Sequence, residues 1–345
     1  MNILSQIKAS KKTFIIAEIG QNHQGDINIA KQLIKVAKEC GVDCVKFQKT
    51  CLTEKFTQSA LDIIYEGPNS WGGTYGSHKE HLEFSEEEFL QLQTYSKDLG
   101  MMFTASAMDS QSFEFLKNID VPFIKIGSGD FNNLLLMTKA AQSGIPLIIS
   151  TGMADVNLVN TIYQLVSRYH KNFALLHCIS AYPTPCKDVN LKVIPEFQAL
   201  FPDVPIGYSG HELGIYVTVT AVALGAKIIE RHITLDKNMK GTDHKCSLEP
   251  NEFKTMVAII RDVEVALGQP LKQIQPSEIP CFKKLGKSLV YAKDLVLGHK
   301  LRNNDIKIKV SVPKGLDPLE CHNILGKVLK CSVRKDDPVN SEQII

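Results

Sequence analysis

The chain has 345 residues, of which 44% are hydrophobic and 22% charged, with a formal net charge of +2 at pH 7. This composition is ordinary for a globular protein, and the length allows one large domain with a smaller companion. The absence of a basic block, an acidic tail or a long apolar run speaks against nucleic acid or a membrane as a partner.

The N-terminal residues, MNILSQIKASKK, lack the apolar core of a signal peptide. The nine cysteines are scattered and form no CxxC pair, which suits reduced thiols and predicts a cytoplasmic protein. Cys178 lies in an apolar run, so we interpret it as a core residue rather than a nucleophile.

Short apolar runs rich in Ile, Val and Phe predict eight strands that are buried on both faces. They are FIIAEIG (14–20), CVKFQK (44–49), MFTASA (102–107), FIKIGSG (123–129), LIISTGM (147–153), FALLHCIS (173–180), PIGYSGH (205–211) and KIIERHIT (227–234). Between these runs lie helical patterns with start and stop signals. They cover 27–40, 85–100, 132–143, 155–169 and 250–267, and the second begins with a capping box of Ser85 and Glu88 and ends at Gly100. This alternation predicts a closed (β/α)₈ barrel. A doubly wound open sheet is the alternative, which the lack of a GxGxxG motif disfavours.

Two segments depart from the regular alternation. Residues 50–84 form a long insertion between the second and third strands, with Trp71 and several glycines. It predicts either a binding loop or a surface loop packed by its own aromatic residues. After Gly268, proline-rich polar residues suggest a linker, and short apolar runs then predict a small domain of strands and turns. We therefore divide the chain into a catalytic barrel (1–275), a linker (276–285) and a C-terminal domain (286–345).

Polar residues stand at the end of every predicted strand, where barrel enzymes carry their catalytic groups. His211 and His232 end two successive strands that a helix joins, so they should lie close together and could hold a divalent metal. Lys46 and Lys125 are cations within apolar strands and need an anionic partner. That partner is either an internal carboxylate, such as Glu18 for Lys46 or Asp130 for Lys125, or a bound phosphate or carboxylate, which the nearby serines favour.

Seven stretches together resemble the sialic acid synthase family. They are IIAEIGQNHQGD (15–26), VKFQK (45–49), KIGSGD (125–130), STGM (150–153), SAYPTP (180–185), GYSGH (207–211) and LGAKIIERHITLDK (224–237). The enzymes of this family are barrels that condense phosphoenolpyruvate with an N-acetylmannosamine, and their C-terminal domain is an antifreeze-like (SAF) domain. SWGGTYGSHKEHLEFS (70–85) is most similar to the animal members, which use the 6-phosphate of N-acetylmannosamine and make N-acetylneuraminate 9-phosphate.

The resemblance implies roles for residues that match the family's motifs. His211 and His232 match ligands for manganese or magnesium, and Glu18 matches a catalytic carboxylate. The residues expected to bind phosphoenolpyruvate are Lys46, Ser106, Lys125, Ser128, Ser150, Ser180 and Ser209. Gln48, Asp130, Tyr182 and Asp243 are expected to hold the sugar. The catalytic set is Glu18, Lys46, Lys125, His211 and His232.

The resemblance also implies a domain-swapped homodimer, in which each C-terminal domain covers its partner's barrel. Bacterial relatives carry an arginine in that domain where this chain has Val310, with Lys309 or Lys314 as candidate replacements. Other substrates stay open: free N-acetylmannosamine, or mannose 6-phosphate, which would give the deaminated product KDN 9-phosphate. A different metal-dependent aldolase or hydrolase is a second enzyme reading. A sugar- or ice-binding protein acting through the C-terminal domain is the non-enzymatic one.

Overall fold

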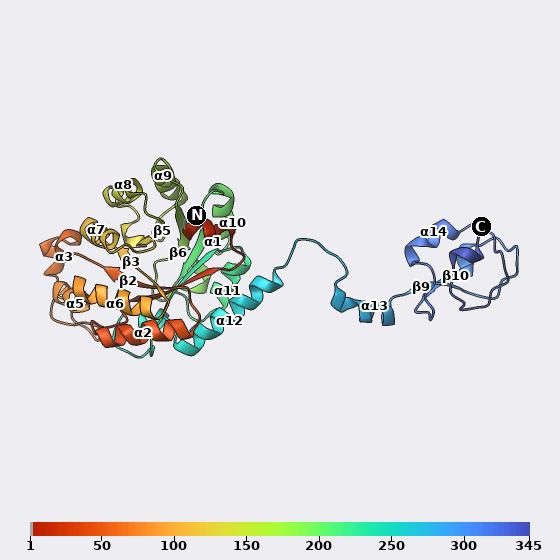
Figure 1. The fold of residues 1–345 in the computed structure, drawn as a ribbon, viewed down its shortest axis with the longest axis horizontal. Helices are drawn as coiled ribbons and strands as arrows, with labels where there is room; N and C mark the ends of the chain where they lie inside the picture. Colours follow the sequence, from red (N-terminus) through yellow and green to blue (C-terminus); the bar gives the residue numbers. More distant parts are fainter. Residues whose placement is uncertain (1–2) are drawn as a thin grey trace. The chain divides into compact units, whose positions relative to one another are not determined.

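The computed structural model describes residues 3–345, which divide into two compact units, one extending to Gly268 and the other comprising Gln269–Ile345 (Figure 1). Within these residues eight parallel strands close a barrel in chain order, with β8 paired to β1. The predicted barrel is confirmed and the open sheet is excluded. The strands are β1 Phe14–Gly20, β2 Cys44–Lys49, β3 Met102–Ala107, β4 Ile124–Ile126, β5 Leu147–Ser150, β6 Phe173–Cys178, β7 Ile206–Gly210 and β8 Ile228–His232.

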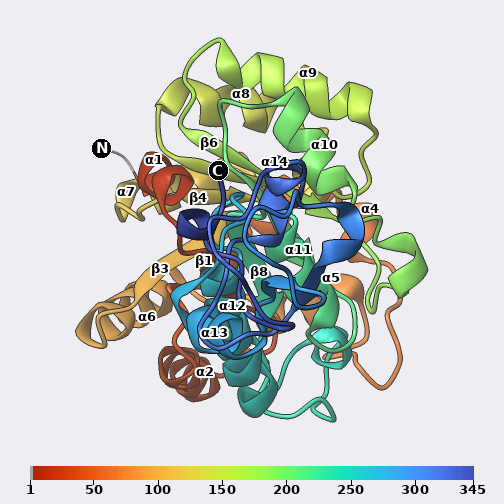
Figure 2. The same cartoon turned by 90° about the vertical axis from the view of Figure 1, so that its right-hand side faces the viewer.

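Helices surround the strands, as Figure 2 shows for α2, α6, α8 and α10. Those of the barrel unit are α1 Ile3–Ala9, α2 Ile27–Glu39, α3 Leu52–Lys55, α4 Gln58–Leu61, α5 Tyr75–Leu82, α6 Glu86–Asp98, α7 Ser110–Asn118, α8 Leu134–Ser143, α9 Val156–Ser167, α10 Val193–Leu200, α11 Tyr216–Ala223 and α12 Pro250–Ala266. Capping fixes several of them: Ser85 and Glu88 form the predicted capping box at the start of α6, and Asp109 accepts from Ser112 N at the start of α7. Among the described residues no helix is long and apolar enough to cross a bilayer.

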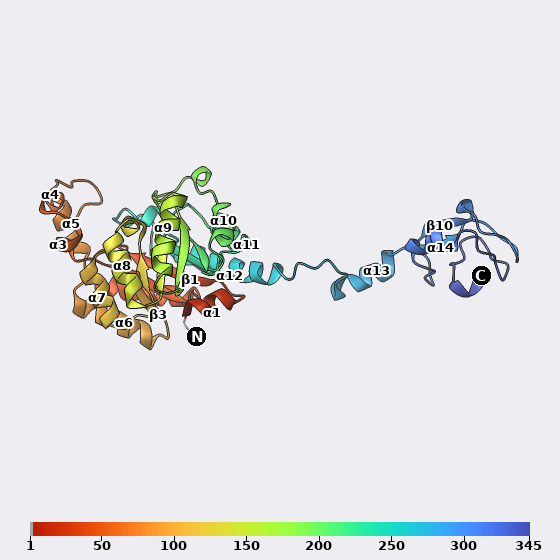
Figure 3. The same ribbon diagram turned by 90° about the horizontal axis from the view of Figure 1, so that it is seen from above.

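The two faces of each strand have different roles. In β1, Ile15 and Ala17 pack into the core shared with the helices, whereas Phe14 and Ile16 join a separate apolar cluster. Helix α1 contributes Leu4 and Ile7 to that cluster. Figure 3 shows α1 at one end of the barrel unit and α3, α4 and α5 at the other. Apolar packing therefore fills one end of the barrel, and polar side chains are left for the end where the strands terminate.

The C-terminal unit has its own core, formed by residues that include Leu289, Tyr291, Leu301 and Val339. Strands β9 Ser288–Tyr291 and β10 Ile306–Lys309 pair antiparallel, and α14 spans Cys321–Ile324. Within 324–333 the chain forms isolated bridges rather than a further strand. The residues that we assigned to the linker, 276–285, form a short 3-10 turn and helix α13 Ile279–Leu285, and their side chains are exposed.

A buried carboxylate makes the stability of the C-terminal unit dependent on pH. Asp305 accepts from Lys293 at 2.9 Å, from His299 at 2.8 Å and from the backbone N–H of Arg302 at 2.9 Å. Burial alone would raise its pKa, but these donors hold the pKa at about 2, below the ordinary 3.8.

We expect the ionised Asp305 to stabilise the folded unit above pH 4, and this contribution to be lost as the pH falls from about 4 to 2. The shift corresponds to about 2 kcal/mol of unfolding free energy. Urea unfolding of the full chain at pH 6 and pH 2 measures it. Asp305→Asn should lower stability at pH 6 and flatten this pH dependence. An unchanged slope would remove Asp305 from this role.

Candidate active site

A cavity of about 310 Å³ opens where the barrel strands end. Of the fourteen predicted site residues, thirteen line it: Glu18, Lys46, Gln48, Ser106, Lys125, Ser128, Asp130, Ser150, Ser180, Tyr182, Ser209, His211 and His232. The parallel strands explain this convergence, because their C-terminal ends all lie on the same rim. The fourteenth residue, Asp243, lies in the loop after β8.

A buried cluster of two lysines and two glutamates forms the floor of the cavity. Lys46 Nζ lies 2.5 Å from Glu18 Oε2 and donates to Ser106 Oγ at 2.9 Å. Lys125 Nζ lies 3.2 Å from Glu230 Oε1, which also accepts from Ser209 Oγ at 3.1 Å. Internal pairing, one of the two alternatives for these lysines, is therefore present in this structure. The expected partner of Lys125 was wrong: it is Glu230, whereas Asp130 lies 3.7 Å from Lys55.

The two glutamates titrate in opposite directions. Burial and the charge of Glu230 raise the pKa of Glu18 to about 7, although Lys46 opposes the shift. Burial would raise the pKa of Glu230 as well, but Lys125 and Lys46 together hold it at about 2. Two carboxylates in one buried cluster are thus separated in pKa by their neighbouring lysines. One is firmly ionised at neutral pH, and the other can exchange a proton there.

Glu230 is a site residue to which the sequence analysis gave no role. The sequence does contain a pattern that could have identified it. Glu230 and His232 are two residues apart in a strand and therefore share the inner face of the barrel. Arg231, between them, faces the other way. Its guanidinium is fully buried outside the cavity, 2.8 Å from Glu212 Oε1. Although Arg231 also lies at the end of a strand, it does not line the cavity.

Two serine hydroxyls in the cavity lack hydrogen-bond partners among the described residues. Within residues 3–345, the buried Ser150 Oγ and Ser180 Oγ make no hydrogen bond. Ser128 Oγ accepts from the backbone N–H of Gly152 at 3.0 Å. A Cβ atom on Gly152 would lie 2.3 Å from Ser180 Oγ and 2.6 Å from Ser128 Oγ, so only glycine allows this close approach. Buried polar groups are normally satisfied, so these unpaired hydroxyls indicate a polar ligand such as a phosphate or carboxylate.

The two histidines lie together at the cavity wall, with ring centroids 5.3 Å apart. The Tyr182 ring is tilted against that of His211, with centroids 4.1 Å apart. Burial lowers the pKa of each histidine to about 4, so both imidazoles are neutral at pH 7. His211 Nδ1 is 3.0 Å from the carbonyl of Ile179, to which it can donate, and this arrangement leaves Nε2 free. His232 Nδ1 is buried and has no hydrogen-bond partner among the described residues.

These features fit a divalent cation, because neutral imidazole nitrogens without protein partners are its usual ligands. Residues 3–345 contain no group of three or more His, Cys, Asp or Glu side chains arranged to hold a metal. The chain would therefore supply two imidazoles, and substrate or water would complete the coordination.

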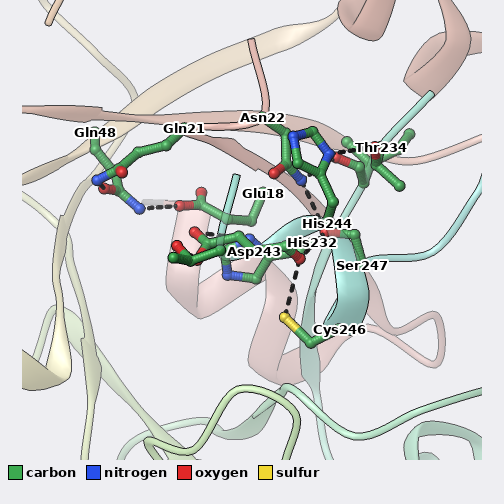
Figure 4. A network of polar contacts seen from close by, with 12 residues as sticks. Glu18, Gln21, Asn22, Gln48, His232, Thr234, Asp243, His244, Cys246 and Ser247 are labelled. Carbon is green, nitrogen blue, oxygen red and sulfur yellow. Dashed lines mark hydrogen bonds and ion pairs between the residues drawn. The ribbon is translucent and has the colours of Figure 1, made fainter. Parts of the chain in front are cut away.

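A hydrogen-bond network behind His232 positions Asp243 (Figure 4). Asp243 Oδ2 lies 3.9 Å from His232 Nδ1, and the backbone carbonyl of Asp243 accepts from Ser247 Oγ at 2.7 Å. Asn22 Nδ2 donates to Ser247 Oγ at 2.8 Å and to the carbonyl of Ile233, also at 2.8 Å. On the other side of the site, Gln48 Nε2 donates to Glu18 Oε1 at 2.9 Å. Asp243 thus lies at the cavity's edge, next to the paired imidazoles.

The candidate replacements for the bacterial arginine are engaged within the C-terminal unit. Lys309 Nζ lies 2.5 Å from Asp336 Oδ1, and Lys314 donates to the carbonyl of Gly286. The side chain of Val310 is about half exposed.

Two family models match the chain and follow its division into units. The NeuB family model matches residues 33–272, and the SAF domain model matches residues 286–344.

Curated proteins and solved structures give the same picture. The human N-acetylneuraminate-9-phosphate synthase is 51% identical over 331 residues, covering 96% of this chain and 92% of that protein. The Drosophila melanogaster protein of the same name is 47% identical and covers 100% of this chain and 99% of its own. A crystal structure of N-acetylneuraminic acid (sialic acid) synthetase from Leptospira borgpetersenii superposes with a TM-score of 0.70. It is 33% identical and covers 79% of this chain and 90% of that one.

Proposed function

The chain belongs to the NeuB family, and we infer that it is a transferase of sialic acid biosynthesis that condenses phosphoenolpyruvate with N-acetylmannosamine 6-phosphate. Water is the third reactant, and the products are N-acetylneuraminate 9-phosphate and inorganic phosphate. The identity to animal enzymes of that name, over nearly the whole of both chains, supports this reaction. The observation that carries the inference is the meeting of buried lysines, unpaired serine hydroxyls and paired imidazoles in one cavity.

We propose that the lysines and serines bind phosphoenolpyruvate. Lys46 and Lys125 face the phosphate and carboxylate, and Ser106, Ser128, Ser150, Ser180 and Ser209 donate to their oxygens. An anionic ligand would satisfy the unpaired hydroxyls of Ser150 and Ser180. Held in this way, phosphoenolpyruvate presents carbon 3 to the second substrate, and the gain in rate is mainly one of orientation.

The remaining residues are assigned to the sugar. Gln48, Asp130, Tyr182 and Asp243 hold the open-chain form with its aldehyde near His211 and His232. These imidazoles would hold Mn²⁺ or Mg²⁺, which when bound polarises a carbonyl oxygen. Carbon 3 of phosphoenolpyruvate forms a bond to the aldehyde carbon, and the aldehyde oxygen takes a proton. Water adds its hydroxyl to carbon 2 and releases a proton. The C–O bond to phosphate then breaks, phosphate leaves with the electron pair of that bond, and the hydroxyl on carbon 2 loses its proton to give the keto acid. Glu18 is placed to orient a reactant or to accept a proton.

We also propose that the protein acts as a homodimer, with each C-terminal unit covering the barrel of the partner. The exposed segment 271–285 supports this arrangement, because it carries apolar side chains, including Ile279 and Phe282, that solvent would otherwise surround. Sedimentation of the purified chain tests the proposal, and a monomer at micromolar concentration would contradict it.

A product assay tests the proposed reaction. The full chain is incubated with phosphoenolpyruvate and one of three sugars: N-acetylmannosamine 6-phosphate, N-acetylmannosamine or mannose 6-phosphate. We expect the first to give one phosphate released per molecule of the nine-carbon 9-phosphate, as measured by phosphate release and mass spectrometry. Chelation of divalent metal should stop the reaction, and added Mn²⁺ or Mg²⁺ should restore it. Equal or faster turnover of the free sugar would contradict the assignment to the 6-phosphate.

A further inference from the structure

A second cavity, of about 200 Å³, adjoins the active-site cavity. Gln48, Lys55 and Met108 line both cavities, so the two share a wall. The second cavity is built largely by the insertion, which supplies Tyr75 and Lys79 from α5. Of the residues that line it, only Gln48 has a role assigned above.

The wall of this cavity is positively charged. Lys79 Nζ donates to Gln21 Oε1 at 3.2 Å and lies 5.4 Å from the centre of the Tyr75 ring, and within residues 3–345 it forms no ion pair. Lys55 adds a second ammonium group, 3.7 Å from Asp130 Oδ2. The carboxylate in the wall, Glu83, is neutralised by Lys49 Nζ at 2.6 Å. Burial lowers the pKa of Lys79. The charge of Asp243 opposes this shift, and the charge of Lys55 adds to it. Lys79 is thus a half-buried ammonium group with no ion pair among the described residues, which favours an anionic ligand.

We propose that this cavity binds the phosphate group of the sugar substrate, with Lys79 and Lys55 as the cationic contacts. The proposal rests on the proposed function, in which the substrate is a 6-phosphorylated sugar. It identifies Lys79 as the residue that selects the phosphorylated sugar over the free one.

The placement of the cavity suits a substrate that reacts at its other end. Glu18 Oε1 accepts from Gln48 Nε2 at 2.9 Å, Gln48 Oε1 accepts from Gln21 Nε2 at 3.2 Å, and Gln21 Oε1 accepts from Lys79 (Figure 4 shows the first three residues). A short chain of side chains thus leads from the catalytic carboxylate to the ammonium group. An extended sugar whose aldehyde lies near His232 could place its terminal phosphate beside Lys79.

Packing holds the insertion in place. Trp71 stacks on His81 with ring centroids 5.3 Å apart, and Lys240 Nζ lies 4.8 Å from the centre of the Trp71 ring. The backbone N–H of Gly241 donates to Asn69 Oδ1 at 3.1 Å. The insertion is therefore fixed to the loop that carries Asp243. Of the two predictions for this insertion, packing by its own aromatic residues is confirmed, and the binding role is the one proposed here.

The test compares two sugars in one variant. Lys79→Met should raise the KM for N-acetylmannosamine 6-phosphate about 10- to 100-fold, as expected for the loss of one charge-assisted contact. The ratio of kcat/KM for the phosphorylated sugar to that for free N-acetylmannosamine should fall by a similar factor. The KM for phosphoenolpyruvate should change by no more than about twofold. If the free sugar is not turned over, its inhibition constant replaces kcat/KM in the comparison.

Three controls separate the possible outcomes. Lys79→Arg keeps the charge and should retain most of the preference, and Lys97→Met removes an exposed lysine from α6 and should change nothing. An equal loss for both sugars in Lys79→Met would show a structural role and overturn the proposal, as would an unchanged ratio. A wild-type chain that releases no phosphate with either sugar would instead overturn the proposed function itself.

Discussion

Replacing Lys125 by Met will lower kcat/KM about 10²- to 10³-fold, because the variant loses the buried cation that we propose contacts phosphoenolpyruvate. Lys125 lines the active-site cavity at the end of β4, and its side chain is about 3% exposed, so water cannot take the place of the missing charge. Steady-state phosphate release with both substrates measures the effect. The fold should survive, because Glu230 Oε1 still has two partners: Lys46 Nζ at 3.8 Å and Ser209 Oγ, which donates to it at 3.1 Å.

A double variant separates catalysis from stability. Lys125→Met leaves Glu230 with one fewer cation, which should cost some stability. Adding Glu230→Gln removes the charge that is left less well compensated, and should recover the melting temperature without recovering activity. Near-normal turnover in a folded Lys125→Met protein would exclude Lys125 from the active site.

The barrel could be predicted because its strands are short apolar runs, which burial on both faces requires. All eight strands lie within three residues of the predicted bounds at each end, and β1, β2 and β3 match them. Helix α1 was not predicted. It has seven residues, of which Leu4 and Ile7 are buried, and two buried positions are too few to define a periodicity. The four-residue helices α3 and α4 escaped prediction for the same reason.

The sequence could predict which residues line the site, but not which carboxylate pairs with which lysine. Strand order places the residues on one rim, and this was enough to bring Lys46, Lys125 and His211 into one cavity. Which carboxylate meets which lysine depends on contacts across the barrel, between strands distant in sequence, such as β4 and β8. Lys125 therefore pairs with Glu230, 105 positions away, rather than with Asp130 nearby. The second cavity could not be foreseen, since it depends on how the insertion packs.

Arg231→Met will destabilise the barrel unit by about 3 to 5 kcal/mol, because it leaves the Glu212 carboxylate buried without its cation. Both side chains are fully buried, and the guanidinium also donates to Thr218 and to the carbonyl of Gly214. For a domain of this size, the melting temperature should fall by roughly 6 to 20 °C.

The matched control for Arg231→Met is Lys171→Met, which breaks a pair with Asp203 whose side chains are nearly half exposed. Exposed pairs contribute about 1 kcal/mol or less, so this variant should melt close to the parent. Adding Glu212→Gln to Arg231→Met should recover part of the loss, because the uncompensated charge is then gone. Equal melting temperatures for the two single variants would contradict the prediction. Because Glu212 follows His211 directly, movement of this pair should also displace the imidazole, so activity should fall with stability.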